Sequence, residues 1–307
     1  MPENYWNMWR HRYQITQALE YSVRISNRGE GNTVLATSSS RLALLATCVL
    51  LSALPNSSAY ADEAEELAKK LANPIASLIS VPFQYNYDHN IGPVGGGHKN
   101  YVNVQPVVPI SLNADWNMIS RTIVPVVWQD EIFPGAGNQF GLSDTVQSFF
   151  FSPKQPTNGI IWGVGPVLLL PTGTDELLSS EKWGAGPTAV ALTQQGPWTV
   201  GLLANHIWSF AGDENRSDVN STFLQPFIAY NTSDAWTFSL NTESTYNWEA
   251  QEWSVPINFV VSKLKKFGDQ PVSLGVGVRY WADAPEDTGP EGWGARAVMT
   301  FLFPTGQ

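Results

Sequence analysis

Residues 76–304 contain twelve short stretches in which apolar and polar side chains alternate, and the gaps between them are alternately short and long. Residues two apart lie on the same face of a β-strand. In the stretch 270–282, one row is Val272, Leu274, Val276, Val278 and Tyr280, and the other is Ser273, Gly275, Gly277 and Arg279. An even number of such strands, with tight turns at one end and longer loops at the other, is typical of a transmembrane β-barrel.

The alternation defines the twelve expected strands. They are 76–90, 99–113, 116–130, 140–152, 159–171, 184–194, 197–210, 219–232, 235–246, 252–264, 270–282 and 292–303. Most exceed the roughly 9–11 residues that cross a bilayer at a tilt. The sequence therefore predicts an all-β fold, a twelve-stranded antiparallel transmembrane β-barrel over 76–304 that closes between its first and last strands. The longer odd-numbered connections should lie at the outer end, and the short even-numbered ones at the periplasmic end.

Composition argues against two other classes of protein. No run of 18 apolar residues occurs, which argues against a helical membrane protein. Charged residues make up only 14% of the chain, and 13 tryptophans are present, which argues against intrinsic disorder.

An export signal precedes the expected barrel. Arg41 is followed by the apolar run 42–54 and then by the small-x-small site Ala59-Tyr60-Ala61. This arrangement is typical of a secretory signal peptide, here 34–61, that directs export by the Sec route and is cleaved before Asp62. Residues 1–33 fit no signal n-region and are interpreted as an upstream extension from an over-extended start. A buried core helix is the alternative interpretation of the apolar run.

Cleavage would remove the single cysteine, Cys48, and so exclude disulfides, a thiolate nucleophile and Cys-based metal sites. It would also remove five Arg and three acidic residues, leaving 12 basic and 24 acidic residues. That acidic balance disfavours nucleic acid as a partner.

A short periplasmic helix is expected within 62–75. Its acidic residues come first and Lys69-Lys70 come last, as the helix dipole prefers, and Asn73-Pro74 ends it. The main interpretation is a solvated lead-in to the barrel. A plug that enters the lumen is the alternative.

Tryptophans cluster near the ends of the expected strands, where amphipathic rings form girdles at the membrane interface. They are Trp116, Trp128, Trp162, Trp183, Trp198, Trp208, Trp236, Trp248, Trp253, Trp281 and Trp293. In a soluble secreted β-sandwich the same residues would form the core. Prolines inside the strands, such as Pro106 and Pro256, predict bulges or kinks.

Many phrases occur in the order seen in one bacterial family. They include NPIASLISVPFQYNYD, IWGVGPVLLLPTGTD, KWGAGPTAVAL, GPWTVGLLANHIWSFAG and QPVSLGVGVRYW. Over about residues 73–304 the chain resembles the outer-membrane family of the meta-pathway of phenol degradation, often labelled neuromedin U-like. The resemblance implies a barrel with a transport role and carries over no catalytic residue.

Motifs for catalysis, cofactors and metals are absent. The glycine-rich stretch 92–99 has no Ser or Thr after its last glycine and no following helix, so it is not a phosphate loop. His206 and Ser209 are three residues apart and should face opposite sides of a strand, which argues against an esterase pair. The sequence therefore predicts a protein that is not an enzyme and binds no cofactor or metal.

Polar residues on the rows opposite the aliphatic ones are the candidate lumen and selectivity residues. They are Asn103, Gln105, Arg121, Gln147, Asn241, Glu243, Asn258, Arg279 and Arg296. A charge facing lipid costs about 2–4 kcal/mol at mid-membrane, so the charged ones should face the lumen. Arg279 and Arg296 lie on adjacent strands, and Glu243 is their candidate partner. The cluster either braces a narrow barrel or forms a constriction that selects solutes.

The expected function is that of a bacterial outer-membrane barrel, a passive channel or transporter for small molecules, aromatic or hydrophobic ones among them. Its expected partners are outer-membrane lipid and lipopolysaccharide, the solutes, and the barrel-assembly machinery. A structural or adhesive barrel with a plugged lumen and a soluble β-sandwich are the alternatives.

Overall fold

The computed structural model describes residues 57–304. The expected extension 1–33 and the expected signal segment up to residue 56 lie outside the described residues. The elements are α1 (Ser57–Leu71), β1 (Ile79–Ile91), β2 (Gly97–Val104), β3 (Val107–Ser111), β4 (Trp116–Asp130), β5 (Asn138–Leu142), β6 (Thr145–Pro153), β7 (Ile161–Leu170), β8 (Lys182–Gln195), β9 (Trp198–Gly212), β10 (Asn220–Asn231), β11 (Trp236–Thr242), β12 (Ser244–Asn247), β13 (Glu252–Phe267), β14 (Gln270–Asp283) and β15 (Gly292–Phe303).

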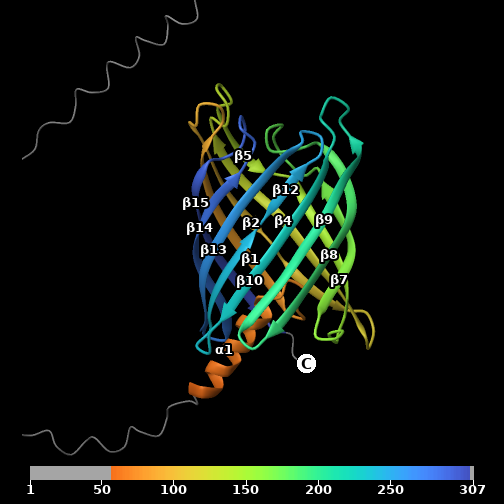
Figure 1. Ribbon diagram of the computed structural model, residues 1–307, viewed down its shortest axis with the longest axis vertical. Coiled ribbons are helices and arrows are strands. Elements are labelled where there is room, and N and C mark those ends of the chain that lie inside the picture. The colour runs from red at the N-terminus through yellow and green to blue at the C-terminus, as the bar shows by residue number, and fades with distance from the viewer. Residues whose placement is uncertain (1–56, 305–307) are drawn as a thin grey trace, which may run out of the picture. The chain divides into compact units, whose positions relative to one another are not determined.

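These segments form one closed antiparallel barrel (Figure 1). Three barrel strands are each interrupted once, so β2 with β3, β5 with β6, and β11 with β12 count as one strand each, and the wall has twelve. The barrel closes where β1 pairs with β15, with Ile79 opposite Phe303. The predicted twelve-stranded barrel and its closure are confirmed, and the β-sandwich alternative is wrong because the described strands form a single closed sheet.

Proline and glycine explain where the strands depart from regular pairing. Pro106 lies at the break between β2 and β3, and the register shifts between Val255 and Pro256 in β13. Pro82 stays in regular pairing opposite Thr300, so proline does not always mark a bulge. The expected turn 265–269 is shorter than predicted because Gly268, at a φ of 63°, permits a two-residue turn and extends β13 to Phe267.

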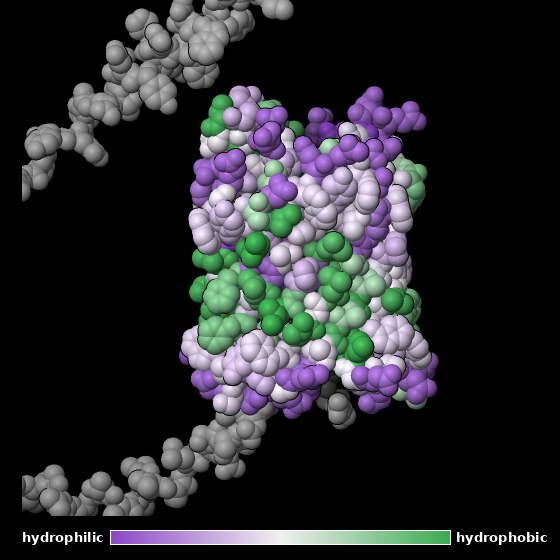
Figure 2. Space-filling model, in the orientation of Figure 1, coloured by the Kyte–Doolittle hydropathy of each residue, from purple (hydrophilic) through white to green (hydrophobic). Residues whose placement is uncertain are grey.

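The outer surface of the wall is apolar across its middle. Figure 2 shows a hydrophobic band between two polar ends. Exposed side chains of this band include Val200, Leu202, Ile257, Phe259, Leu274, Val276 and Val278. Exposed tryptophans flank it on both sides, Trp116, Trp198 and Trp236 at one end and Trp183, Trp208, Trp253 and Trp293 at the other.

The two ends of the barrel differ as predicted. The connections 92–96, 131–137, 171–181, 213–219, 248–251 and 284–291 lie at the end opposite α1 and the last residues of β15, and are called here the loop end (Figure 1). The connections at the α1 end are short, among them 196–197 and 268–269, except for 154–160. An apolar belt, aromatic flanks and loops of this asymmetry define a transmembrane β-barrel.

No helix in the described part of the chain is long and apolar enough to cross a bilayer.

Candidate solute pathway

The helix α1 lies against the α1 end of the lumen. Leu67 and Ala68 are buried in a cluster with Leu78, Leu264 and Leu302. Polar contacts fix the same segment, because Gln194 Nε2 donates to the Lys69 carbonyl at 2.8 Å and Lys266 pairs with Glu63 at 2.7 Å. The apolar side of α1 therefore packs on the barrel end, which a fully solvated lead-in would not do, while Glu63 and Glu66 on the same helix stay exposed.

The segment after α1 reaches further into the barrel. Ile75 is 4% exposed and packs with Ile119, Phe150, Val190 and Leu203, which come from β4, β6, β8 and β9. One face of the lumen is thus a conventional apolar core, called here the apolar wall. It fastens the N-terminal segment inside the barrel.

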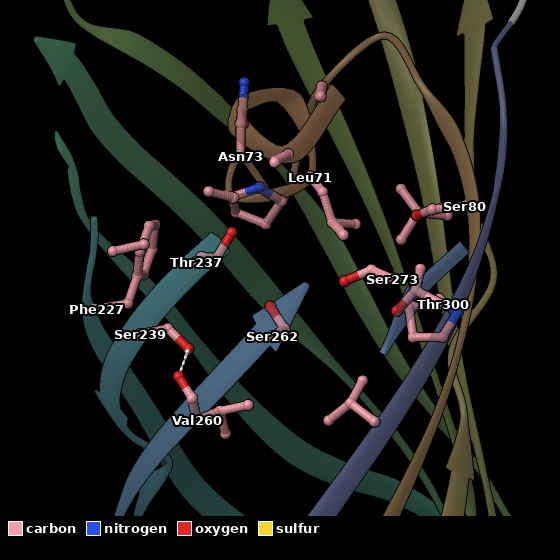
Figure 3. Close-up of a pocket in the computed structure, with 18 of the residues that line it drawn as sticks. Leu71, Asn73, Ser80, Phe227, Thr237, Ser239, Val260, Ser262, Ser273 and Thr300 are labelled. Atoms are coloured by element: carbon pink, nitrogen blue, oxygen red, sulfur yellow. Dashed lines mark hydrogen bonds between the residues drawn. The ribbon is translucent and has the colours of Figure 1, made fainter. Parts of the chain in front are cut away.

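A cavity of about 280 Å³, called here the inner cavity, lies beyond this segment. Hydroxyl groups from several strands surround it, those of Ser80, Thr237, Ser239, Ser262, Ser273 and Thr300 (Figure 3). Apolar side chains share its lining, among them Val107, Phe227 and Val298. The inner cavity therefore offers both hydrogen-bonding and apolar contacts.

Charged side chains from strands far apart in sequence meet in the lumen. Arg296 donates to both carboxylate oxygens of Glu243, at 2.9 and 2.7 Å, and its Nε donates to Asn86 Oδ1 at 2.8 Å. Arg279 lies 3.6 Å from Asp88 and 4.0 Å from Glu243. We call Asp88, Glu243, Arg279 and Arg296 the charge cluster. The predicted contact of Glu243 with the two arginines is present.

The register of the barrel produces this cluster. Asn86 in β1 lies opposite Arg296 of β15 on one side and Tyr101 of β2 on the other. Tyr101 accepts a hydrogen bond from Arg279. Gly277 lies opposite Arg296, and a Cβ at Gly277 would lie 2.3 Å from the Phe259 carbonyl oxygen, so only glycine fits this inward position.

The other predicted lumen residues lie near the cluster, with one exception. Arg121 donates to Gln105 Oε1 at 3.2 Å, and both line the inner cavity. Asn258 donates to Asn241 Oδ1 at 2.9 Å. Asn103 lines a second cavity of about 370 Å³ on the loop side of the cluster, called here the outer cavity. Whether any of these residues selects solutes stays a prediction.

The lumen placement of Gln147 is wrong. Ser148, its neighbour in β6, is buried and pairs with the inward Arg121, so Gln147 lies on the outward row opposite Thr122. Its amide is satisfied there, because it accepts from the Thr122 hydroxyl at 2.5 Å and donates to Ser120 Oγ at 3.0 Å. Internal hydrogen bonds lower the cost of an amide on the lipid-facing side.

Several lumen residues were missed. Asn86 and Asp88 are 0% and 3% exposed and lie on the inward row of β1. The alternation of apolar and polar side chains is not visible along β1, because the outward row of Tyr85, Tyr87 and His89 is also partly polar. Trp281 was expected in a girdle, but it points inward, where its Nε1 donates to Asp88 Oδ1 at 2.9 Å and its ring lies 4.5 Å from the Arg279 guanidinium.

The loop 171–181 narrows the loop end of the lumen. The Asp144 carboxylate accepts hydrogen bonds from the Ser179 and Ser180 hydroxyls, both at 2.6 Å. Leu177 lines the outer cavity, and Arg216 donates to the Glu176 and Ser179 carbonyls. These contacts fold the loop inward over the wall.

A second contact ties the base of this loop to the next one. Lys182 pairs with Asp218 at 3.0 Å, and Ser209 donates to the same carboxylate. The hydrogen bonds from Lys182 and from Ser209 hold the pKa of Asp218 below its usual value. His206 lies on the outward row of β9, where it contacts Thr222, so it is separated from the inward Ser209 as predicted.

Within residues 57–304, no group of three or more His, Cys, Asp or Glu side chains could hold a metal ion.

Comparison with known proteins supports the architecture. No family model matches the chain, and no curated protein matches it. The crystal structure of an outer-membrane channel from Pseudomonas putida F1 superposes with a TM-score of 0.57 at 14% identity, over 74% of this chain and 96% of that one. The NanC porin gives a TM-score of 0.45 at 12% identity, over 74% of this chain and all of that one. The first similarity shows a shared barrel fold, and the second is too weak to add to it.

Proposed function

We propose that this protein is a channel of the bacterial outer membrane that passes small solutes passively through its lumen. The observation that carries the proposal is the charge cluster, which lies between the inner and outer cavities. Burying ionised groups is costly unless they are paired, and hydrophobic replacements of such pairs are often as stable. A barrel that only needed bracing could be filled by apolar side chains, as its apolar wall is. Rings of charge inside a pore set its selectivity.

Planar-bilayer recording of the purified barrel tests this proposal. Discrete conductance steps in KCl are expected from the wild-type protein. A panel of small neutral, anionic and cationic solutes in a liposome-swelling assay would then define what passes. A correctly folded barrel, identified by its heat-modifiable migration in gels, that never conducts would contradict the proposal.

The alternative of a structural or adhesive barrel with a plugged lumen is favoured by one observation, the packing of α1 and Ile75 in the α1 end. The variant Leu67→Ser separates the two. It removes an apolar anchor of α1, so a channel should conduct more, whereas a structural barrel should stay closed. Glu65→Gln on the same helix is the matched control, because Glu65 makes no hydrogen bond or ion pair among the described residues.

The export route, the cleavage site, the assembly route and the class of solute are proposed from the sequence. Export by the Sec route with cleavage before Asp62 would leave most of α1 in the mature protein, and the barrel-assembly machinery would insert the barrel among outer-membrane lipid and lipopolysaccharide. The ordered phrases of residues 73–304 support membership of the meta-pathway family, which makes aromatic or hydrophobic solutes candidates. Detection of Asp62 as the N-terminal residue of the exported protein tests the cleavage site.

A further inference from the structure

Arg121 differs from the other two arginines of the lumen in having few partners. One of its five N–H donors is used by Gln105, and no carboxylate of the described residues lies within 4.0 Å. Arg296, in contrast, uses three donors on Glu243 and Asn86. The Arg121 guanidinium lines the inner cavity with most of its donors available to a ligand.

The two cavities and the charge cluster together carry more positive than negative charge. In the part of the chain that the structure describes, the cations of the cavities and the charge cluster are Lys70, Lys99, Arg121, Arg279 and Arg296, and the carboxylates are Asp88 and Glu243. Lys70 pairs with Glu66 at 2.8 Å, which leaves four cations against two carboxylates. In a confined lumen of low effective dielectric constant, this excess attracts an anion more strongly than it would in bulk water.

The remaining lining of the inner cavity suits an amphipathic molecule. The hydroxyls of Ser80, Ser273 and Thr300 have no side-chain hydrogen-bond partner among the described residues, and they point toward the cavity (Figure 3). Val107 and Phe227 supply apolar surface in the same cavity. Its volume of about 280 Å³ is near the lower limit of the roughly 300–1,000 Å³ typical of sites for drug-sized ligands, so the ligand must be small.

We propose that the inner cavity is a binding site for small monocarboxylates with a short apolar body. The planar guanidinium of Arg121 binds the carboxylate through two parallel N–H donors, a geometry that arginine provides and lysine does not. The hydrocarbon body lies against Val107 and Phe227. This inference rests on the proposed function in one respect, that the solute reaches the cavity through the lumen.

Isothermal titration calorimetry on the full barrel in detergent tests the site, with the heat of titration into empty micelles subtracted. The probes are hexanoate, 1-hexanol and hexylamine, which each contain six carbon atoms and differ in charge. The wild-type barrel should bind hexanoate at least tenfold more tightly than the other two. Arg121→Gln should weaken hexanoate binding about tenfold or more. The hexanoate affinity of Arg121→Lys should lie between those of the wild-type barrel and Arg121→Gln. Lys265→Gln, which removes a positive charge at the exposed α1 end, is the matched control and should leave the affinity unchanged.

Two results would overturn the site: equal binding of hexanol and hexanoate to the wild-type barrel, or unchanged hexanoate affinity in folded Arg121→Gln. The first comparison needs no variant, so a misfolded variant does not leave the question open. Bilayer conductance is measured separately. Hexanoate binding by a barrel that does not conduct would contradict the channel function but support the binding site. Conductance without hexanoate binding would contradict the binding site but support the channel function.

Discussion

The two walls of the lumen hold the barrel together by different interactions. The apolar wall places Phe150, Ile119 and Leu203 at 0–1% exposure around Ile75 and behaves as the core of a soluble protein would. The opposite wall, built largely from β1, β14 and β15, places the charge cluster at a similar depth. Filling the lumen did not require charge, because the cluster around Ile75 is filled by apolar side chains alone.

The comparison predicts that both walls support stability but that only one of them controls ions. The largest expected effect is on the apolar wall. Phe150→Ala leaves a cavity and should lower the free energy of unfolding by about 3–5 kcal/mol, with little change in ion selectivity. Urea unfolding followed by tryptophan fluorescence measures it. Phe151→Ala, on the outward row of the same strand, is the control and should cost less because lipid fills the space. Equal losses would remove the distinction between core and lipid-facing rows.

The next effect concerns the charge cluster. Glu243→Gln leaves Arg296 and Arg279 without their shared carboxylate. Loss of one partner of a buried pair costs about 3–5 kcal/mol, and the lower end applies here because the Glu243 side chain keeps 20% exposure. The same variant should move the selectivity toward anions. Glu286→Gln, in the connection 284–291 at the loop end, is the control. If the unfolding curve of Glu243→Gln were identical to that of Glu286→Gln, the ion pair between Glu243 and Arg296 would be dispensable for stability.

Much of this architecture could be predicted from the sequence because it depends on local periodicity. Rows such as Leu274, Val276 and Val278 fix which residues face lipid, and the opposite row then places Arg279 inward. The register could not be followed through 145–153, where Phe149, Phe150 and Phe151 interrupt the alternation, and Gln147 was assigned to the wrong face. The packing of α1 could not be predicted either, since its apolar residues Leu67, Ala68 and Leu71 show a buried face only once the barrel end is known.

The smallest effect concerns the loop end. The pKa of Asp218 is lowered by its hydrogen bond from Lys182, so the contact stabilises the fold above the usual Asp value of 3.8 and is lost as the pH falls through the lower folded-state pKa. The connection 213–219 should therefore become more accessible to an acid-active protease only at a pH below the usual Asp value of 3.8. Asp218→Asn should show that accessibility already at neutral pH, measured with a protease that is active at neutral pH, and Asp287→Asn should not. Full protection of Asp218→Asn would contradict the role of this contact.

The most direct test of the channel account is the reversal potential of single barrels across a tenfold KCl gradient. The excess of lumen cations predicts that the wild-type barrel prefers chloride. Arg279→Ala and Arg296→Ala should each shift the reversal potential toward that of potassium, whereas Phe150→Ala should leave it unchanged. Identical reversal potentials in the wild-type barrel and both arginine variants would show that the charge cluster only braces the wall.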